Sequence, residues 1–462
     1  MTIIAEEYGI DKILANRFSH FIRRFKIARL LNRIGAGKIM GVTATAVFTF
    51  MLGLVFTRRN LYEVYRSERD KPTFGKDVVY RFLGKSGVHW ESLIPALAAQ
   101  VIPEIDRLTS EKRISAWVID DSPYYRDRSK KVEFLSWCKD HSENRYYKGF
   151  AFLAMGWTDG NTFVPSDFRL VASGNDKNLL EGSHVAEDGR TRATKRRREA
   201  RTDKPALVLT MLEKAKDTHP ETKHVLFDTW FSAPKAILDI SAKGFYVVAR
   251  IKNHKNYRYL YNGECLSLRQ IWSRNKKRRG RSKYLLSVCV DVRHADYDET
   301  VPAKIIFVRN KNKRSEWIAI LSTDMTLTEE DVIALYGKRW DIEPFFKFIK
   351  SALRLTKEFQ LRSFDAIVAH AAIVLTRYIF VAIESREDKD WRSFGDIGML
   401  LYEELEDMSF REAFALLITF FKNCLRECLH LSMETIDALV SFFIDSLPTY
   451  IKGRVMVSGC ES

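Results

Sequence analysis

Several features that assign a protein to a class are missing from this sequence. It has six cysteines among 462 residues, with no Cys-x-x-Cys pair and no histidines at the spacing of a zinc site. This excludes the common zinc motifs and favours a reduced, cytoplasmic compartment. Cys424 and Cys428 stand four residues apart in a helix-like stretch, which suits a core position better than a pair of ligands.

A secretory signal and a membrane span are missing as well. The N-terminus has no charged-then-apolar signal pattern. The stretch GVTATAVFTFMLGLVF at 41–56 is apolar, but its 16 residues include three threonines and fall short of the roughly 20 residues that a spanning helix needs. We expect this stretch to form a buried helix. The sequence has no internal repeat.

What is present is a large apolar fraction and an excess of positive charge. With 46% hydrophobic residues, the chain can bury a core and form more than one domain. Lys and Arg number 75 against 59 Asp and Glu, which gives a formal net charge of +16. Such an excess suits a nucleic-acid partner or simply a basic surface. The clustered charge lies at 23–29, 126–131, 194–201 and 274–283, and each run alone is equally compatible with a solvated face or a loop.

The order of predicted elements divides the chain into five regions. Residues 1–110 are typical of helices. Residues 111–252 predict a strand, a two-stranded hairpin around an Asp159-Gly160 turn, and then helix, strand, helix and strand. Residues 253–315 form a basic, strand-rich insertion, residues 316–385 predict a strand followed by helices, and residues 386–462 are again helical. The class is therefore α/β, with a mixed sheet flanked by helical N- and C-terminal regions.

The segment YGKRWDIEPFFKFIK at 336–350 combines a polar face with an apolar one. At about 100° per residue on a helix, its polar residues fall within an arc of about 60° and its apolar residues on another side. The polar residues are Tyr336, Arg339, Glu343 and Lys350. Pro344 cannot donate a backbone hydrogen bond, so we expect the helix to kink or restart near it.

Acidic residues far apart in the sequence are predicted to meet at one edge of the sheet. Asp120 and Asp121 end the first strand, Asp228 lies near the end of the fourth, and Glu343 stands on the helix after the last. Carboxylates without His or Cys partners suit Mg²⁺ or Mn²⁺. Two such ions can activate an attacking oxygen and stabilise the leaving oxygen at phosphorus. Each acid alone is equally typical of a turn, a cap or a surface ion pair.

These residues resemble the DDE transposases of the insertion-sequence-4 family. Tyr336, Arg339, Glu343 and Lys350 reproduce the Y-(2)-R-(3)-E-(6)-K signature of that family, and the segments VIDDS and LFDTWFSAP resemble its first and second aspartate segments. The resemblance spans at least 113–351. It implies a ribonuclease-H-like catalytic domain in two parts, 111–252 and 316–385, interrupted by the β-rich insertion at 253–315.

The resemblance also implies roles for single residues. Asp121, Asp228 and Glu343 match the catalytic triad that binds two Mg²⁺ or Mn²⁺ ions. Asp121 is preferred to Asp120 because Ser122 follows it, as a small residue follows the family acid. Three further residues match those that bind the DNA phosphate in the family, namely Tyr336, Arg339 and Lys350. Trp317 resembles a tryptophan that supports a flipped base in some members, although a tryptophan at a strand start also suits a core position.

The function implied by the resemblance is DNA transposition. A transposase would bind the terminal inverted repeats of its element, cleave there and join the 3′ ends to target DNA. The partners are then transposon-end duplex and target DNA, with 1–110 as a DNA-binding region and 386–462 as a dimerisation region of a homodimer. We expect a cytoplasmic, nucleoid-associated protein. The alternatives are a ribonuclease-H-like nuclease without strand transfer and a transposase-derived DNA-binding regulator.

Overall fold

The structure, a computed structural model, describes most of the chain and divides it into two compact units. The described residues are 12–57, 59–67, 72–109, 113–140, 143–184, 189–278, 282–310, 316–387 and 432–446, with positions 418, 422 and 425. The first unit comprises Met1–Phe21, Thr49–Gly75 and Trp391–Ser462, and the second Ile22–Phe48 and Lys76–Asp390. Most of the region predicted to dimerise, 386–462, lies outside the described residues, as do Cys424 and Cys428.

The described part of the first unit is helical. Its helices are most of α2 (Lys12–Arg24), the end of α4 (Ala44–Leu54), η1 (Val55–Thr57), α5 (Leu61–Arg66) and α16 (Met433–Ser446). Phe50 packs edge-on against Phe74 with ring centroids 5.5 Å apart, and Phe18 lies 5.5 Å from Phe56. The expectation of a buried helix within 41–56 is confirmed, since α4 carries fully buried residues such as Met51 and Leu52.

The second unit is built on a large mixed sheet. Before the sheet come α3 (Ile27–Arg33), β1 (Lys38–Ile39), β2 (Val42–Thr43), α6 (Lys76–Leu83), η2 (Trp90–Ser92) and α7 (Leu93–Asp106). The sheet begins with β3 (Ala116–Tyr125), β4 (Ser136–Asp140), β5 (Arg145–Thr158) and β6 (Phe163–Val171). It continues, after η3 (Asp176–Asn178), α8 (Arg192–Ala200) and α9 (Lys204–Thr218), with β7 (His224–Phe227), η4 (Thr229–Phe231), α10 (Pro234–Ala242) and β8 (Tyr246–Ile251).

Five of these strands form a ribonuclease-H-like core. β5 pairs antiparallel with both β6 and β3, whereas β3, β7 and β8 pair in parallel. The expected hairpin turn after β5 is confirmed, because Gly160 takes the positive φ of 86° that a tight turn there requires. The predicted class, a mixed α/β sheet flanked by helices in a ribonuclease-H-like fold, is therefore what the structure has.

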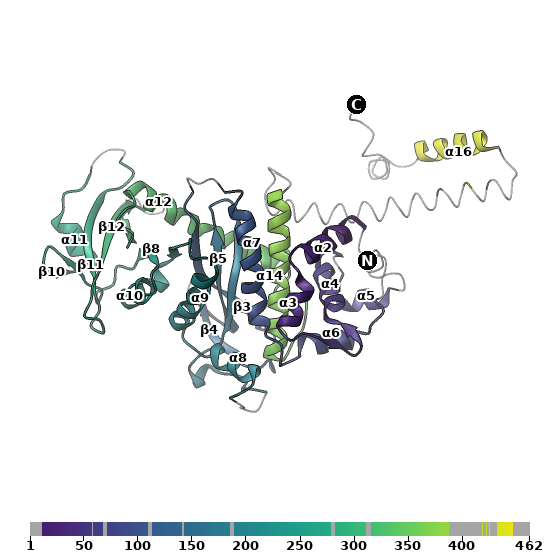
Figure 1. Cartoon of the computed structure of the whole chain (residues 1–462), viewed down its shortest axis with the longest axis horizontal. Helices are drawn as coiled ribbons and strands as arrows, with labels where there is room; N and C mark the ends of the chain where they lie inside the picture. Colours follow the sequence, from purple (N-terminus) through teal and green to yellow (C-terminus); the bar gives the residue numbers. More distant parts are fainter. Residues whose placement is uncertain are drawn as a thin grey trace. The chain divides into compact units, whose positions relative to one another are not determined.

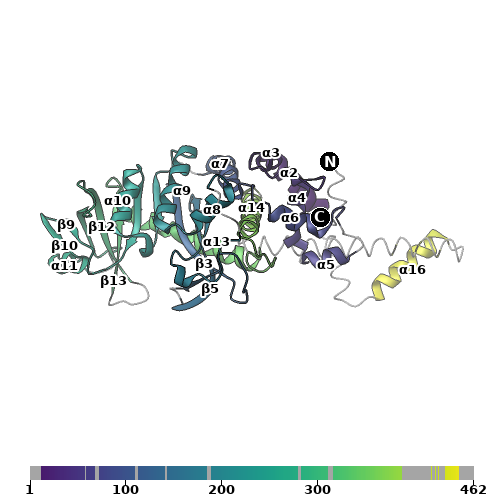
Figure 2. The ribbon, with the colours of Figure 1, turned by 90° about the horizontal axis from the view of Figure 1, so that it is seen from below.

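The residues after β8 extend the same sheet rather than starting another. They form β9 (Tyr259–Tyr261), β10 (Glu264–Leu266), α11 (Leu268–Arg274), β11 (Leu286–Val292), β12 (Val301–Arg309) and β13 (Trp317–Ser322). β13 pairs antiparallel with β12 on one side and with β8 on the other. In Figure 2 the strands β9, β10, β12 and β13 gather at one end of this unit, with α10 and α11 beside them.

The last described helices of the second unit are α12 (Glu329–Gly337), η5 (Lys338–Asp341), α13 (Ile342–Ser351) and α14 (Phe364–Glu387). α12 begins with a capping box, in which Thr328 and Asp331 satisfy each other's backbone amides. α14 is long and apolar enough to cross a membrane by composition, yet its apolar window is entirely buried inside the protein. It lies beside α7 in Figure 1 and serves as a core helix.

Alternation along β3 and β5 gives the sheet two distinct faces. Phe150 and Phe152, both even-numbered, contact Phe364 of α14 and Phe346 of α13. The odd-numbered Met155 instead lines a cavity together with residues of α7 and α9. Successive side chains of a strand point to opposite faces, so the even-numbered residues of β3 and β5 face α13 and α14.

Candidate active site

Two of the predicted acids stand at matching positions on neighbouring parallel strands. The pairing of β3 with β7 runs from Ala116 opposite His224 to Val118 opposite Leu226. Continued two residues further, this register sets Asp120 opposite Asp228. Residues paired in a parallel ladder lie side by side on one face. Asp120, rather than Asp121, is therefore the aspartate of β3 on the face that Asp228 shares.

The hydrogen bonds of Asp120 and Asp121 agree with this alternation. Asp120 Oδ2 lies 3.4 Å from Arg339 Nη1. Asp121 Oδ2 instead accepts a hydrogen bond of 2.8 Å from Lys204 Nζ at the start of α9. The two adjacent aspartates thus have different partners. Asp120 contacts Arg339, whereas Asp121 pairs with Lys204 and its charge also acts on Lys350 of α13.

Arg339 links the acids of the even-numbered face. Its Nη2 donates a 3.0 Å hydrogen bond to Glu343 Oε1, four residues along the chain, and its Nη1 lies near Asp120. Burial alone would lower the pKa of the Arg339 guanidinium, but the charges of Asp228 and Asp120 and the Tyr336 phenol outweigh it and raise the pKa. A single buried cation thus sits among the carboxylates of three separate elements.

Burial and the charges of neighbouring carboxylates oppose the ionisation of Asp120. Burial raises the pKa of Asp120 to about 7, and the charges of Asp121 and Asp228 act in the same direction against Arg339. Asp228 Oδ1 is buried and has no hydrogen-bond partner. Within the described ranges, no group of three or more His, Cys, Asp or Glu side chains is close enough to hold an ion as it stands.

The donor set nevertheless suits a divalent metal. Asp120, Asp228 and Glu343 offer only carboxylate oxygens, which are the ligands that Mg²⁺ and Mn²⁺ prefer. The unpartnered Oδ1 of Asp228 is a buried acceptor that a cation would satisfy. Glu343 would have to exchange its contact with Arg339 for the metal, since its side chain is now held by that guanidinium.

The helix that carries Glu343 is not continuous with the one before it. The chain passes from α12 through the 3₁₀ turn η5 and restarts at Ile342, so Pro344 falls in the first turn of α13. A missing N–H costs nothing there because the first turn has no intrahelical acceptors. The expected restart near Pro344 is confirmed. The four polar residues therefore do not share one continuous helix, although Arg339 and Glu343 still form a hydrogen bond.

Tyr336 and Lys350 lie on either side of this break. Tyr336 is buried and Arg339 lies 5.9 Å from its ring centre, while burial raises the pKa of its phenol to about 12. Lys350 Nζ donates a 2.5 Å hydrogen bond to Ser122 Oγ on β3, and burial lowers its pKa to about 8. Lys350 therefore also meets β3 next to the acids.

Trp317 lies within a cluster of rings at the start of β13. Its ring centre is 5.5 Å from that of Trp272 and 4.9 Å from that of Phe307. Two exposed tryptophans also lie close in sequence to Asp228 and Glu343, namely Trp230 and Trp340, which are 54% and 58% exposed. Each carries a cation over its ring, Lys204 at 5.3 Å and Arg339 at 5.2 Å. Sequence reasoning missed both, although their positions beside Asp228 and Arg339 were a signal.

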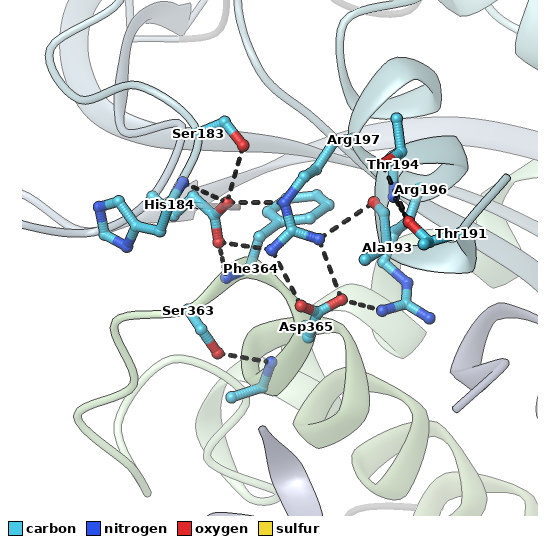
Figure 3. A network of polar contacts seen from close by, with 12 residues as sticks. Ser183, His184, Thr191, Ala193, Thr194, Arg196, Arg197, Ser363, Phe364 and Asp365 are labelled. Carbon is cyan, nitrogen blue, oxygen red and sulfur yellow. Dashed lines mark hydrogen bonds and ion pairs between the residues drawn. The ribbon is translucent and has the colours of Figure 1, made fainter. Parts of the chain in front are cut away.

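The basic run at 194–201 is divided between buried and exposed cations, since Arg196 and Arg197 are buried whereas Lys195 and Arg198 are exposed. Arg197 forms paired hydrogen bonds with Glu133, at 2.7 and 2.9 Å, and reaches Asp365 at 2.9 Å (Figure 3). Arg196 pairs with Asp365 and with Glu91. Hydrogen bonds from Arg197 and from backbone amides outweigh burial and lower the pKa of Glu133. The interpretation of this run as phosphate contacts is wrong for these two arginines.

The run at 126–131 is divided in the same way. Arg126 is buried and donates to the Phe359 carbonyl at 3.3 Å and to the Tyr124 hydroxyl at 3.0 Å. Arg128, Lys130 and Lys131 are exposed. Only the latter part of this run therefore offers cations to a partner. Of the run at 274–283, residues 279–281 lie outside the described part of the chain.

Two family models match this chain. A family model described as DDE superfamily endonuclease matches residues 52–285, slightly more than half of the chain. A second, described as Transposase DDE domain, matches residues 193–380. No match was found among the curated proteins. The two matched ranges together include Asp120 on β3, Asp228 directly after β7 and Glu343 on α13.

Proposed function

Because the chain belongs to the DDE superfamily of endonucleases, we propose that it is a transposase of the insertion-sequence-4 family. It binds the terminal inverted repeats of its own element, cleaves the DNA there and joins the freed 3′ ends to target DNA. The observation that carries the proposal is the position of Arg339 among the carboxylates of β3, β7 and α13. The arginine of the family signature thus lies near acids that are far apart in the sequence.

The proposal includes a metal site of Asp228, Glu343 and one aspartate of β3. Two Mg²⁺ or Mn²⁺ ions bound there would supply charge stabilisation during in-line displacement at phosphorus. The motif favours Asp121 as the aspartate of β3, while the register with Asp228 and the contact with Arg339 support Asp120. We therefore propose Asp120 as the metal ligand. Asp121, which the motif alone favours, is instead paired with Lys204.

The remaining signature residues act on the DNA backbone in this proposal. Arg339 can release Glu343 and bind a phosphate bidentately. Lys350, held by Ser122 beside β3, can offer its ammonium group to the same strand. Tyr336 is buried and keeps its proton at neutral pH, since its pKa is raised, so it can only support Arg339 or donate a hydrogen bond.

The partners and regions follow from the same reaction. Transposon-end duplex DNA and target DNA are its substrates, and a homodimer would hold two ends together. We retain 1–110 as the DNA-binding region, 253–315 as the insertion and 386–462 as the dimerisation region. A nucleoid-associated cytoplasmic location follows from DNA as the partner. Trp317 stays a candidate to support a flipped base, with its packing against Trp272 as the competing role.

A strand-transfer assay tests this proposal against a nuclease. A pre-cut DNA carrying the sequence that flanks the coding region is incubated with the protein, a supercoiled plasmid and Mg²⁺. Joined product is expected from the unaltered protein and none from Glu343→Gln. Cleavage of uncut ends without joining would instead identify a nuclease, and specific binding without either reaction a DNA-binding regulator. The presence of Asp120, Asp228 and Glu343 argues against the regulator.

A further inference from the structure

A small exposed sheet face stands beyond the candidate site, on the hairpin of β4 and the first residues of β5. Register pairs Trp137 with Lys148 and Lys139 with Tyr146. These four residues, which we call the outer hairpin face, alternate ring and cation in both directions. Lys148 Nζ lies 5.5 Å from the Trp137 ring centre.

The outer hairpin face is exposed, whereas the opposite face of the same hairpin contacts β3. Trp137 is 39% and Tyr146 67% exposed. The opposite face of the hairpin is fixed, because Tyr147 Oη donates to the Phe150 carbonyl at 2.9 Å and Asp140 accepts a 2.8 Å bond from Tyr125 Oη. Two large rings are therefore presented to solvent on a rigid element.

The outer hairpin face continues the sheet face that carries Asp120. Register sets Asp120 opposite Ala154 of β5, and the even-numbered residues of β5 include both Tyr146 and Lys148. At about 3.3 Å per residue, Lys148 lies about 20 Å along the strand from the level of Asp120. This separation is shorter than one turn of duplex DNA, about 34 Å, although α13 and α14 cover Phe150 and Phe152 of the same face between the two levels.

The charge around the hairpin is complementary to DNA. Among the described residues of 126–149, the exposed cations are Arg128, Lys130, Lys131, Lys139 and Arg145, whereas the exposed acids are Asp127 and Glu143. Asp127 accepts a 3.0 Å bond from the Lys148 amide, and Glu143 is paired with Arg145. Both acids are thus engaged within the hairpin.

We propose that the outer hairpin face binds an unpaired DNA strand next to the cleavage position, with Trp137 and Tyr146 stacking on bases and Lys139 and Lys148 holding phosphates. Diagonal neighbours across two strands are about 7–8 Å apart, roughly twice the 3.4 Å between stacked bases. The two rings can therefore stack on nearby bases of one strand. Which DNA is unpaired there rests on the proposed function.

Protection of a sheet edge does not explain the whole arrangement. β4 is a terminal strand of the sheet, and a lysine such as Lys139 on a terminal strand commonly discourages pairing with other chains. Exposed rings have the opposite effect, because they add apolar surface to the same edge. Trp137 and Tyr146 therefore need a second explanation, and base stacking supplies it.

The test measures binding of the full chain to a labelled oligothymidylate and to a fully paired duplex of equal length over a salt series. Replacing both rings, Trp137→Ala with Tyr146→Ala, is expected to weaken oligothymidylate binding by about 30-fold or more, with little change for the duplex. Trp137→Phe with Tyr146→Phe is expected to restore most of it. Lys139→Gln with Lys148→Gln is expected to lower the salt slope by about 1.4, since each phosphate contributes about 0.7.

A matched control is available at the N-terminal ends of the central strands β7 and β8. Lys223 precedes β7 and is exposed, and Tyr246 at the start of β8 is 39% exposed. Lys223→Gln with Tyr246→Ala should leave oligothymidylate binding unchanged. Unchanged binding by the double-ring variant, or equal losses on oligothymidylate and duplex, would overturn the outer hairpin face as a base-stacking site. Because the assay needs no cleavage, that result would leave the proposed transposase function standing.

Discussion

At the scale of residues, the choice between Asp120 and Asp121 illustrates what a sequence can decide. Both aspartates were predicted to end a strand, whereas they lie in the middle of β3, which continues to Tyr125. The following Ser122 favours Asp121 by resemblance. Only the pairing of β3 with β7 brings Asp120 level with Asp228, and this register depends on contacts that no local pattern records. Glu343 and Arg339, four residues apart, could be predicted to meet because that spacing is local.

A first prediction concerns Arg339 as the cation of the site. Arg339→Gln leaves Asp120 and Asp228 without their shared positive neighbour, so we expect a loss of about 1–3 kcal/mol in the free energy of unfolding. Added Mg²⁺ should then raise the midpoint of thermal unfolding more for this variant than for the unaltered protein, because the ion replaces the missing charge. An equal response of the two proteins to Mg²⁺ would contradict a cation site at these carboxylates.

A second prediction separates two tryptophans. Trp317 packs against Trp272 and Phe307, so Trp317→Leu should cost about 1–2 kcal/mol of stability in urea denaturation. Trp230 is 54% exposed, and Trp230→Leu should change stability by no more than about 0.5 kcal/mol. If the two variants lose equal stability, the packing role of Trp317 is wrong.

At the scale of elements, local signals predicted the existence of strands well and helix continuity poorly. β3, β5, β6, β7, β8 and β13 all occur in the predicted order, although β3 continues to Tyr125, past its predicted end at Asp121. The segment at 336–350 was predicted as one helical face, but η5 interrupts it because the chain must turn to place Arg339 and Glu343 against β3. The short strand β4 has no clear apolar alternation, and only its pairing with β5 reveals it.

A third prediction concerns α8 and its buried arginine. Arg197→Met leaves the buried Glu133 without its ion-pair partner and leaves Asp365 with Arg196 alone, so we expect a loss of about 3–5 kcal/mol in the free energy of unfolding. The neighbouring Arg198 is exposed, which makes Arg198→Met a matched control that should change stability by less than about 0.5 kcal/mol. Similar losses for both variants in chemical denaturation would show that charge, and not the buried pairs, stabilises α8.

A fourth prediction concerns acid sensitivity at α14. Burial opposes the charge of Glu358, but Arg377 and His370 outweigh it and lower the pKa of Glu358 from 4.5 to about 2. A lowered carboxyl pKa gives stability that is present above pH 4.5 and is lost as the pH falls toward about 2, here about 3 kcal/mol. The unfolding free energy of Glu358→Gln should be lower at neutral pH and flatter across this window. An unchanged acid slope would refute the role of Glu358.

At the scale of the whole molecule, the order of elements predicted a mixed α/β sheet, and the resemblance to the insertion-sequence-4 family implied its ribonuclease-H-like form. The sequence also predicted a strand-rich insertion before β13, but it could not show that β9 to β12 continue the same sheet beyond the pairing of β13 with β8. The basic runs were the weakest guide. Arg196 and Arg197 form ion pairs with buried acids, whereas no sequence pattern indicated the exposed cations of the β4–β5 hairpin.

The central claim is that carboxylates of three elements on one sheet face form the catalytic site. It is tested most directly by Mg²⁺-dependent cleavage of the element's own ends, measured for four isosteric variants with DNA binding as a control. We expect Asp120→Asn, Asp228→Asn and Glu343→Gln to bind the ends and lose at least about 100-fold in cleavage rate, whereas Asp121→Asn should keep most of it. Full cleavage by any of the first three variants, or loss confined to Asp121→Asn among the two β3 variants, would contradict this account.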